Sequence, residues 1–211
     1  MHANGSQTLD YGVRADCVAE IALLIALGNQ SQRVASEVHV DLLRYLYIQS
    51  DAQRGPRANA SDPNFGLILW GLSPGWTGKY YADDMARVLL GTMTTTAMLT
   101  AEQRTTAGLQ DIERNHLWGI LANLRTQGSH GFRADRFYMD KLYLYGWKYY
   151  AELPIHSTSP HFQSWIWAVY LHAYRHTQYQ PFLELARRGL YETYNLLQTR
   201  ELHWAYSITA Q

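Results

Sequence analysis

Apolar residues recur along most of this chain at spacings of three and four positions, which is the period of an amphipathic α-helix. The clearest stripe consists of Val34, Val38, Leu42, Leu43 and Leu46. No segment shows the apolar–polar alternation that marks a half-buried β-strand. The pattern therefore predicts an all-α fold.

Turn signals divide this helical pattern into three pairs of helices. Gly28 and Asn29 form a typical helix end, and Pro160 and Pro181 fit the first turn of a helix, where a missing backbone donor costs nothing. We expect helices over the approximate ranges 11–27, 31–46, 81–99, 109–126, 160–176 and 181–197. Three helical hairpins in succession form a weak internal repeat, which is typical of stacked or toroidal architectures.

The two helices of each predicted hairpin differ in polarity. The first helices are apolar nearly all round, as in residues 21–27 and 165–171, and such helices are buried by neighbours on several sides. The second helices are amphipathic, with charged residues such as Arg33, Glu184 and Arg187 available for solvent. This difference predicts an inner and an outer ring of helices within one helical domain over residues 1–211.

The most informative polar segment lies where the third predicted helix begins. Two aromatic rings, two carboxylates and a guanidinium follow a loop that contains Trp76, and they are Tyr80, Tyr81, Asp83, Asp84 and Arg87. The first helices of the other hairpins also begin with aromatic and hydrogen-bonding groups, at residues 11–16 and 159–163. We interpret the segment as one wall of a carbohydrate pocket.

Composition and charge exclude several classes of partner. The 211 residues are 47% hydrophobic, which is enough for one sizeable core, and 18 basic against 18 acidic residues give a net charge of zero. A chain without net charge has no global field to hold nucleic acid or an anionic membrane surface, so we expect neither partner. The sequence shows no export signal and no apolar segment of spanning length, so the default expectation is a cytoplasmic location.

Motifs for cofactor chemistry are missing. The chain has neither the Gly-x-Gly-x-x-Gly pattern nor the phosphate loop, so we expect no cofactor. His172 and His176 lie one helical turn apart, but no third ligand accompanies them, so we also expect no metal. Cys17 is the single cysteine and lies among apolar residues, which predicts a buried thiol and excludes an internal disulfide.

Three phrases of the sequence resemble bacterial proteins of the six-hairpin (α/α)6 glycosidase superfamily. They lie at residues 80–87, 121–136 and 159–163, and the first reads Tyr-Tyr-Ala-Asp-Asp-Met-Ala-Arg. The resemblance runs from about Leu9 to the C-terminus and is greatest to a group associated with glucuronic-acid-containing glycans. It implies a toroid of six hairpins, of which this chain supplies about three, so we expect a partial toroid that is a fragment of a longer protein.

Hydrolysis of a uronic-acid-containing glycoside needs one protonated carboxyl group and one ionised carboxylate beside the bond that breaks. Asp83 and Asp84 are adjacent on a helix, about 100° apart in projection, so they are unsuited to form the pair between themselves. We expect Asp135, which lies in a polar loop, to be the second catalytic carboxylate. Asp16 and Glu20 on the first helix are reserves.

The expected substrate contacts surround these carboxylates. Arg87 can brace either neighbouring aspartate, and Arg133 can bind a sugar carboxylate through a two-pronged contact. The remaining candidates supply hydrogen bonds or ring faces to a sugar, and they are Trp76, Tyr80, Tyr81, His161, Gln163 and Trp165.

The residues alone leave other functions open. The carboxylates also fit helix caps and local ion pairs, and the aromatic rings also fit packing between helices. The aromatic-rich connection 138–150 is either a lid or a second packing layer. Three alternatives therefore stand beside the hydrolase: a noncatalytic helical-repeat module that binds carbohydrate or protein, an inactive fragment of a longer enzyme, and a polysaccharide lyase. Half a toroid would expose an apolar edge, through which copies of the chain can associate.

Overall fold

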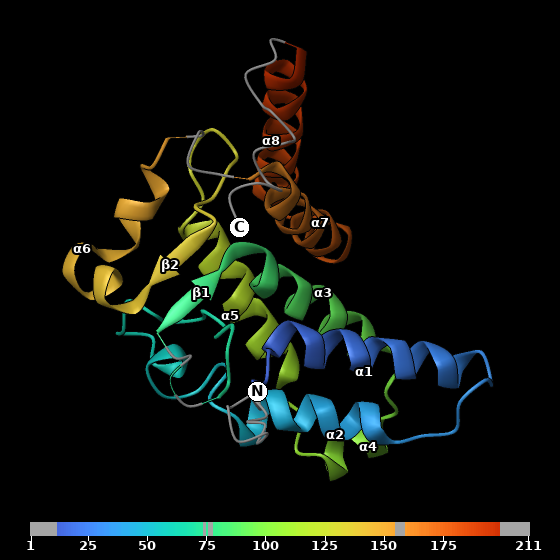
Figure 1. Ribbon diagram of the computed structural model, residues 1–211. Helices are drawn as coiled ribbons and strands as arrows, with labels where there is room; N and C mark the ends of the chain where they lie inside the picture. Colours follow the sequence, from blue (N-terminus) through green and yellow to red (C-terminus); the bar gives the residue numbers. More distant parts are fainter. Residues whose placement is uncertain (1–11, 74, 76–77, 155–158, 199–211) are drawn as a thin grey trace, which may run out of the picture.

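The computed structural model describes residues 12–73, 75, 78–154 and 159–198 and is shown in Figure 1. Its α-helices are α1 (Ala15–Gln30), α2 (Val38–Arg44), α3 (Ala82–Met98), α4 (Ala101–Thr106), α5 (Ile112–Arg125), α6 (Met139–Ala151), α7 (Pro160–Thr177) and α8 (Gln180–Gln198). The shorter elements are a π-helical turn η1 (Tyr45–Gln49), a 3₁₀ turn η2 (Gly55–Ala58) and the strands β1 (Lys79–Tyr81) and β2 (Arg136–Tyr138). Helices dominate the described residues, so the predicted all-α fold is confirmed.

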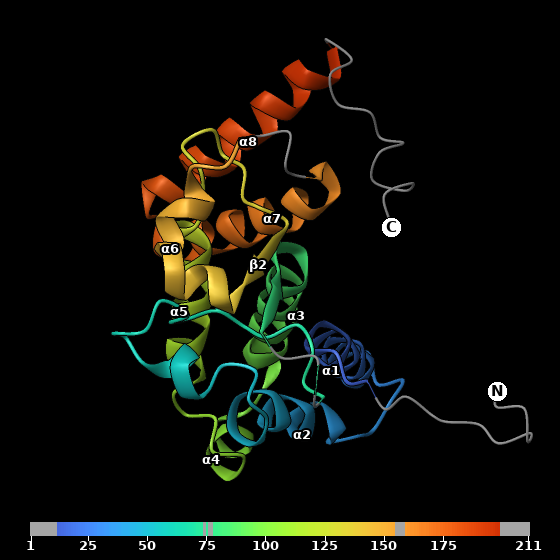
Figure 2. The ribbon, with the colours of Figure 1, turned by 60° about the vertical axis from the view of Figure 1, so that its left-hand side comes forward.

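Helix α3 lies at the centre of the fold, with α1 packed on one side and α7 on the other (Figure 1). The second helices α2, α5 and α8 pack against α1, α3 and α7 respectively, which gives the three expected hairpins. Figure 2 shows α7 and α8 continuing the row beyond α3, away from α1 and α2. Gly91 permits the close approach of α1 to α3, because a Cβ atom there would lie 3.0 Å from the carbonyl oxygen of Ala19.

One hydrophobic core runs through all three hairpins. Leu43 of α2, Leu89 of α3 and Tyr170 of α7 are each fully buried and belong to the same cluster of side chains. The core therefore fixes the relative positions of α1, α3 and α7, and with them the positions of the polar groups at the helix starts.

The second helix begins later than predicted, at Val38, because residues 31–37 form a loop. The side-chain amide of Asn29 closes this loop by donating to the Ser36 carbonyl oxygen at 2.6 Å and accepting from the Ser36 backbone nitrogen at 3.1 Å. Gly28 and Asn29 lie inside α1, and the left-handed residue that follows the helix is Gln32, with φ 58.

The β1–β2 ribbon and helix α6 were not expected from the sequence. The strands pair antiparallel, with Tyr80 opposite Phe137 and Tyr81 opposite Arg136. Each strand has three residues, which is too short for an alternating pattern to be visible. The aromatic-rich connection forms α6, which is interrupted at Gly146, where φ is 69. The ribbon fixes the start of α3 beside the start of α6.

The prediction that helix α1 buries its large apolar side chains is wrong. Its buried face is built mainly from alanines, which let it lie close to α3, whereas Ile21, Leu24 and Leu27 are 50%, 70% and 45% exposed. Cys17 is exposed too, so its predicted burial is wrong. The fold thus has an apolar edge, while self-association through that edge stays a prediction.

Despite this apolar face, none of the helices within the described ranges has the length and hydropathy to cross a membrane.

Candidate functional site

The starts of α1 and α3 bring charged side chains from two hairpins into one group, which we call the helix-start cluster: Arg14, Asp16, Glu20, Asp84 and Arg87. Arg14 Nη2 contacts Asp16 Oδ2 at 2.6 Å and Asp84 Oδ1 at 2.9 Å. Arg87 Nη1 contacts the same two oxygens at 3.0 and 3.3 Å, and its Nε binds Glu20 Oε1 at 2.7 Å. Two guanidinium groups therefore hold two carboxyl groups side by side.

The Asp84 carboxyl group is the most perturbed of the cluster. Its side chain is 6% exposed, and this burial, together with the neighbouring charges of Asp83 and Asp16, raises its pKa to about 8. The charge of Arg14 acts in the opposite direction but is a smaller effect. Burial also raises the pKa of Asp83, whose Oδ2 lies 4.0 Å from Arg87 Nη1. The Asp84 carboxyl group therefore holds a proton more readily than an ordinary aspartate, and in its protonated form it can hydrogen-bond to Asp16.

Aromatic rings and guanidinium groups continue outward from the cluster on both sides. Arg87 lies over the ring of Trp165 on α7, 5.9 Å from its centroid, and Arg14 lies over Trp70 at 5.6 Å. Trp70 packs against Tyr81 at 5.1 Å between centroids. Tyr81 is in turn covered by Arg136 at 5.2 Å. We call these six side chains the helix-start surface: Trp165, Arg87, Arg14, Trp70, Tyr81 and Arg136.

Charge pairing differs along the helix-start surface. The side chains of Arg14 and Arg87 are 37% and 23% exposed and are both bound to carboxylates. Arg136 is exposed, and no carboxylate of the described residues lies within 4.0 Å of it. Unlike Arg14 and Arg87, Arg136 can therefore bind an external anion without first leaving a carboxylate of the described residues.

Asp135 lies in a second, separate polar group. Its Oδ1 accepts from the Ser159 backbone nitrogen at 2.9 Å and from Gln163 Nε2 at 3.2 Å, which ties the loop before β2 to the start of α7. Burial raises the pKa of Asp135. Gln163 is fully buried and also bonds the backbone of Arg133, so its predicted contact with a sugar does not fit its position. His161 is partly buried and packs on Phe162, 4.3 Å between ring centroids.

Two further predicted sugar contacts are interior. Arg133 is 1% exposed, donates to Thr126 Oγ1 at 2.7 Å and to Asn123 Oδ1, and its burial lowers its pKa to about 9. Tyr80 is fully buried and donates to Asn64 Oδ1 at 3.0 Å. Neither side chain can reach a ligand at the surface, which corrects both assignments. Trp76 lies outside the described residues.

Sequence reasoning brought out Asp84, Arg87, Tyr81 and Trp165, and the structure places all four in or beside one surface. It missed the roles of Arg14, Trp70 and Arg136. Arg14 stands within a polar helix start that the sequence does reveal, but nothing in the sequence indicates that it contacts a residue of the second hairpin. Trp70 joins the surface because its carbonyl oxygen accepts from the Ala15 backbone nitrogen at 2.9 Å, at the start of α1. Arg136 joins it because the β1–β2 ribbon pairs it with Tyr81.

Residues 71–75 match the Gly-x-Ser-x-Gly pattern of a nucleophile elbow. That motif requires a serine on a sharp turn between a strand and a helix. Here Gly71 forms an isolated bridge with Arg14, and the Ser73 hydroxyl accepts from the Val13 backbone nitrogen at 2.8 Å. The next regular element is the strand β1, so the serine is not placed as such a nucleophile.

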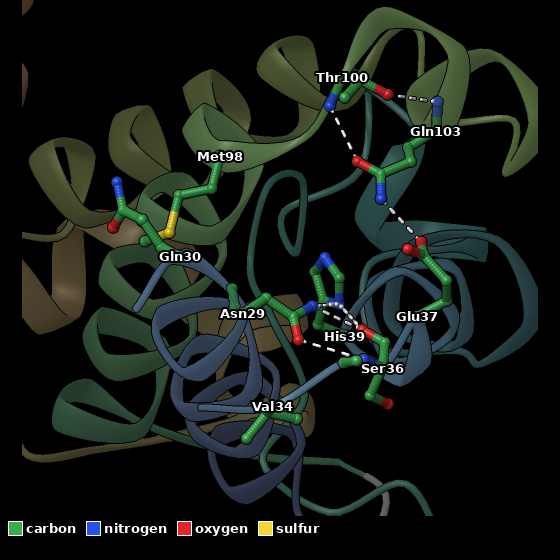
Figure 3. Close-up of a pocket in the computed structure, with 11 residues that line it drawn as sticks. Asn29, Gln30, Val34, Ser36, Glu37, His39, Met98, Thr100 and Gln103 are labelled. Atoms are coloured by element: carbon green, nitrogen blue, oxygen red, sulfur yellow. Dashed lines mark hydrogen bonds between the residues drawn. The ribbon is translucent and has the colours of Figure 1, made fainter. Parts of the chain in front are cut away.

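A pocket of 630 Å³ lies at the C-terminal ends of α1 and α3, at the other end of these helices from the helix-start cluster (Figure 3). Two polar side chains of its wall are engaged within the fold: Asn29 binds the backbone of Ser36, and Gln103 Nε2 donates to Glu37 Oε2 at 2.7 Å. Gln103 also forms a reciprocal capping box with Thr100 at the start of α4. These bonds connect the α1–α2 loop to α4, so the pocket wall is explained by its structural role.

The described residues contain no group of three or more histidine, cysteine, aspartate or glutamate side chains placed to hold a metal ion. The rings of His172 and His176 are 4.6 Å apart between centroids, in a part of the fold away from the helix-start cluster. Comparison of the chain with protein-family models, with curated proteins and with solved structures gave no match. The resemblance to six-hairpin glycosidases therefore rests on the sequence phrases themselves.

Proposed function

We propose that the helix-start surface binds an acidic carbohydrate, with a uronic-acid unit as the recognised group. The observation that supports this proposal is the row of aromatic rings and guanidinium groups that ends in Arg136, which forms no ion pair within the described part of the chain. An aromatic face packs against the C–H face of a pyranose ring, and a guanidinium binds a carboxylate through two parallel hydrogen bonds. Trp165, which is 42% exposed, and Arg136 offer these two contacts to solvent.

The buried carboxyl groups favour a binding site over a hydrolytic one. An acid and a base that act on a glycosidic bond are about 5 to 10 Å apart and have the sugar between them. Asp16 and Asp84 instead share the same two guanidinium nitrogens, so no sugar fits between them. In this arrangement the carboxyl groups orient Arg14 and Arg87 toward the rings of Trp70 and Trp165.

A pair of matched oligosaccharides tests the binding proposal. We expect a tetrasaccharide of glucuronic acid to quench tryptophan fluorescence at lower concentration than the neutral glucose tetrasaccharide of the same linkage. Arg136→Gln should weaken binding of the acidic sugar about tenfold or more, the size of a charge-assisted hydrogen bond, and leave the neutral sugar unchanged. Trp165→Ala should weaken binding of both sugars.

Arg114→Gln is the matched control, because Arg114 also lies over a tryptophan ring, at 5.1 Å, but on α5 outside the helix-start surface. It should leave both affinities unchanged. Equal affinity for the two tetrasaccharides, or an equal loss in Arg136→Gln and Arg114→Gln, would contradict the proposal.

Glycoside hydrolysis is the second candidate, and one observation favours it: the pKa of Asp84 is raised to about 8, as a general acid requires. In this proposal Asp84 protonates the glycosidic oxygen and Asp135 is the second carboxylate. The test is release of 4-nitrophenol from the α- and β-glucuronides, with Asp84→Asn and Asp135→Asn as variants and Glu113→Gln as a control on α5. Turnover by wild type that both aspartate variants lose would establish the hydrolase. A lyase would instead yield an unsaturated, ultraviolet-absorbing product from the glucuronic-acid tetrasaccharide.

A further inference from the structure

A second cavity lies among α3, α5 and α7, on the side of the fold away from the helix-start surface. Its volume is 410 Å³, within the range of about 300 to 1,000 Å³ that is usual for small-molecule pockets. The wall is mainly apolar and includes Met93, Leu117, Ile120 and Phe182. We call it the α3–α5–α7 cavity. Its size and lining suit a ligand of one or two rings.

Two buried polar side chains in the wall of this cavity lack hydrogen-bond partners. Thr96 of α3 is 3% exposed and His116 of α5 is 5% exposed, and both line the cavity. Among the described residues, neither Thr96 Oγ1 nor His116 Nε2 has a partner. Most buried polar atoms in folded proteins are paired, so two unpaired atoms beside one cavity indicate a missing partner.

Among the buried threonines of α3, which are Thr92, Thr95 and Thr96, only the Thr96 hydroxyl is unpaired. The hydroxyls of Thr92 and Thr95 donate to the carbonyl oxygens of Val88 and Gly91 at 2.7 and 2.8 Å, as buried threonines in helices usually do. Thr96 makes no such bond to the preceding turn. Its hydroxyl group therefore keeps both its hydrogen and its lone pairs unused within the described residues.

The His116 ring is held in place and uncharged. It packs edge-on against Tyr47, with the ring centroids 5.6 Å apart, and Tyr47 is itself bonded to Thr92 at 2.9 Å. Burial, together with the charge of Arg104 and the nearby His172, lowers the pKa of His116 to about 3, so the imidazole is neutral. A neutral imidazole nitrogen can form a hydrogen bond with a hydroxyl group as donor or acceptor. It carries no positive charge that would compensate the charge of a buried carboxylate. Arg104, at the cavity rim, is already paired with Glu113.

We propose that the α3–α5–α7 cavity is a binding site for a small aromatic alcohol, whose ring contacts the apolar wall and whose hydroxyl group bonds to Thr96 and His116. This site is independent of the carbohydrate proposal, because no residue of the helix-start surface lines it.

Phenol and toluene form a matched pair of probes, since they share a ring and differ by a hydroxyl against a methyl group. Titration of the full chain, followed by the nitrogen resonances of the histidine rings, should show that phenol binds more tightly than toluene and shifts the Nε2 signal of His116. One hydrogen bond corresponds to a difference of about three- to tenfold in affinity. This comparison needs only the wild-type protein.

Two isosteric variants locate the contact. Thr96→Val should lower the affinity for phenol about three- to tenfold and leave toluene unchanged. Thr95→Val is the control, because the Thr95 hydroxyl is bonded within α3 and does not line the cavity. The proposal is overturned if toluene binds as tightly as phenol, if the His116 signal does not respond to phenol, or if the two variants have the same effect.

Discussion

Asp84→Asn should reduce the decline in stability that the wild-type protein undergoes as the pH rises. In the folded protein the pKa of Asp84 is about 8, against an ordinary value of 3.8. Between these two pH values the folded state binds more protons than the unfolded state, so the free energy of unfolding falls with increasing pH. Asparagine does not titrate, so the variant lacks this contribution.

The magnitude follows from the two pKa values and the surroundings of the side chain. Each pH unit inside the window is worth about 1.36 kcal/mol, so between pH 5 and pH 8 the upper limit is roughly 4 kcal/mol. Water reaches the Arg14 and Arg87 side chains, which are 37% and 23% exposed, and screens the interaction. We therefore expect wild type to lose about 1 to 2 kcal/mol relative to Asp84→Asn over this range.

Urea unfolding followed by tryptophan fluorescence at pH 5, 6.5 and 8 measures the difference. Glu113→Gln is the control, because it removes a carboxylate from the Arg104 ion pair, away from the helix-start cluster. The reasoning is refuted if wild type and Asp84→Asn lose stability in parallel between pH 5 and pH 8.

Three further tests, each by urea unfolding, probe the interior. Gly66→Ala should destabilise the protein by more than about 2 kcal/mol, because φ is +82 and the new Cβ would lie 2.2 Å from a backbone carbonyl oxygen of α5. Gly55→Ala is the control: with φ +59 and nothing within 4 Å of the new Cβ, it should cost about 1 kcal/mol. Similar losses of stability in the two variants would contradict this prediction. Thr95→Val should lower the stability by about 1 kcal/mol, because it removes a hydrogen bond. Thr96→Val should be neutral or stabilising in the ligand-free protein. The reverse order of stabilities would be inconsistent with an unpaired Thr96 hydroxyl. Arg133→Met should destabilise the protein by about 2 kcal/mol, because two buried acceptors lose their donor. A gain in stability would instead show that the cost of burying the charge exceeds the gain from its hydrogen bonds.

The helices were predictable because their signals are local. Apolar spacing marked α1, α3, α5, α7 and α8 to within a few residues, and Pro160 stands at the start of α7 as expected. The start of α2 was not predictable, because the loop before it depends on a side-chain bond between Asn29 and Ser36. The ribbon was missed because three-residue strands show no period, and α6 because its tyrosines and tryptophan fit several structures equally well.

The candidate site was predicted in part. Asp84 and Asp83 precede Arg87 by three and four residues, so their proximity to Arg87 follows from helix geometry, and the structure has both contacts. Arg133 was misplaced because a charged residue in a polar-looking loop is normally solvated, whereas Asn123, Thr126 and the ring of Phe137 enclose it here. No local pattern reports that enclosure.

The sequence by itself determined the helices α1, α3, α5, α7 and α8, the polar and aromatic groups with which the first helices begin, and the charges within one helix that can meet. Only the tertiary structure decided that Arg14 meets Asp84, seventy residues away, and that Arg136 covers the ring of Tyr81. The physical reason is range: a contact within a helix is fixed by the rise and turn of the backbone, whereas a contact between helices depends on how their faces pack. Here the small residues of α1 and Gly91 of α3 allow the close packing that brings two carboxyl groups between the same two guanidinium groups.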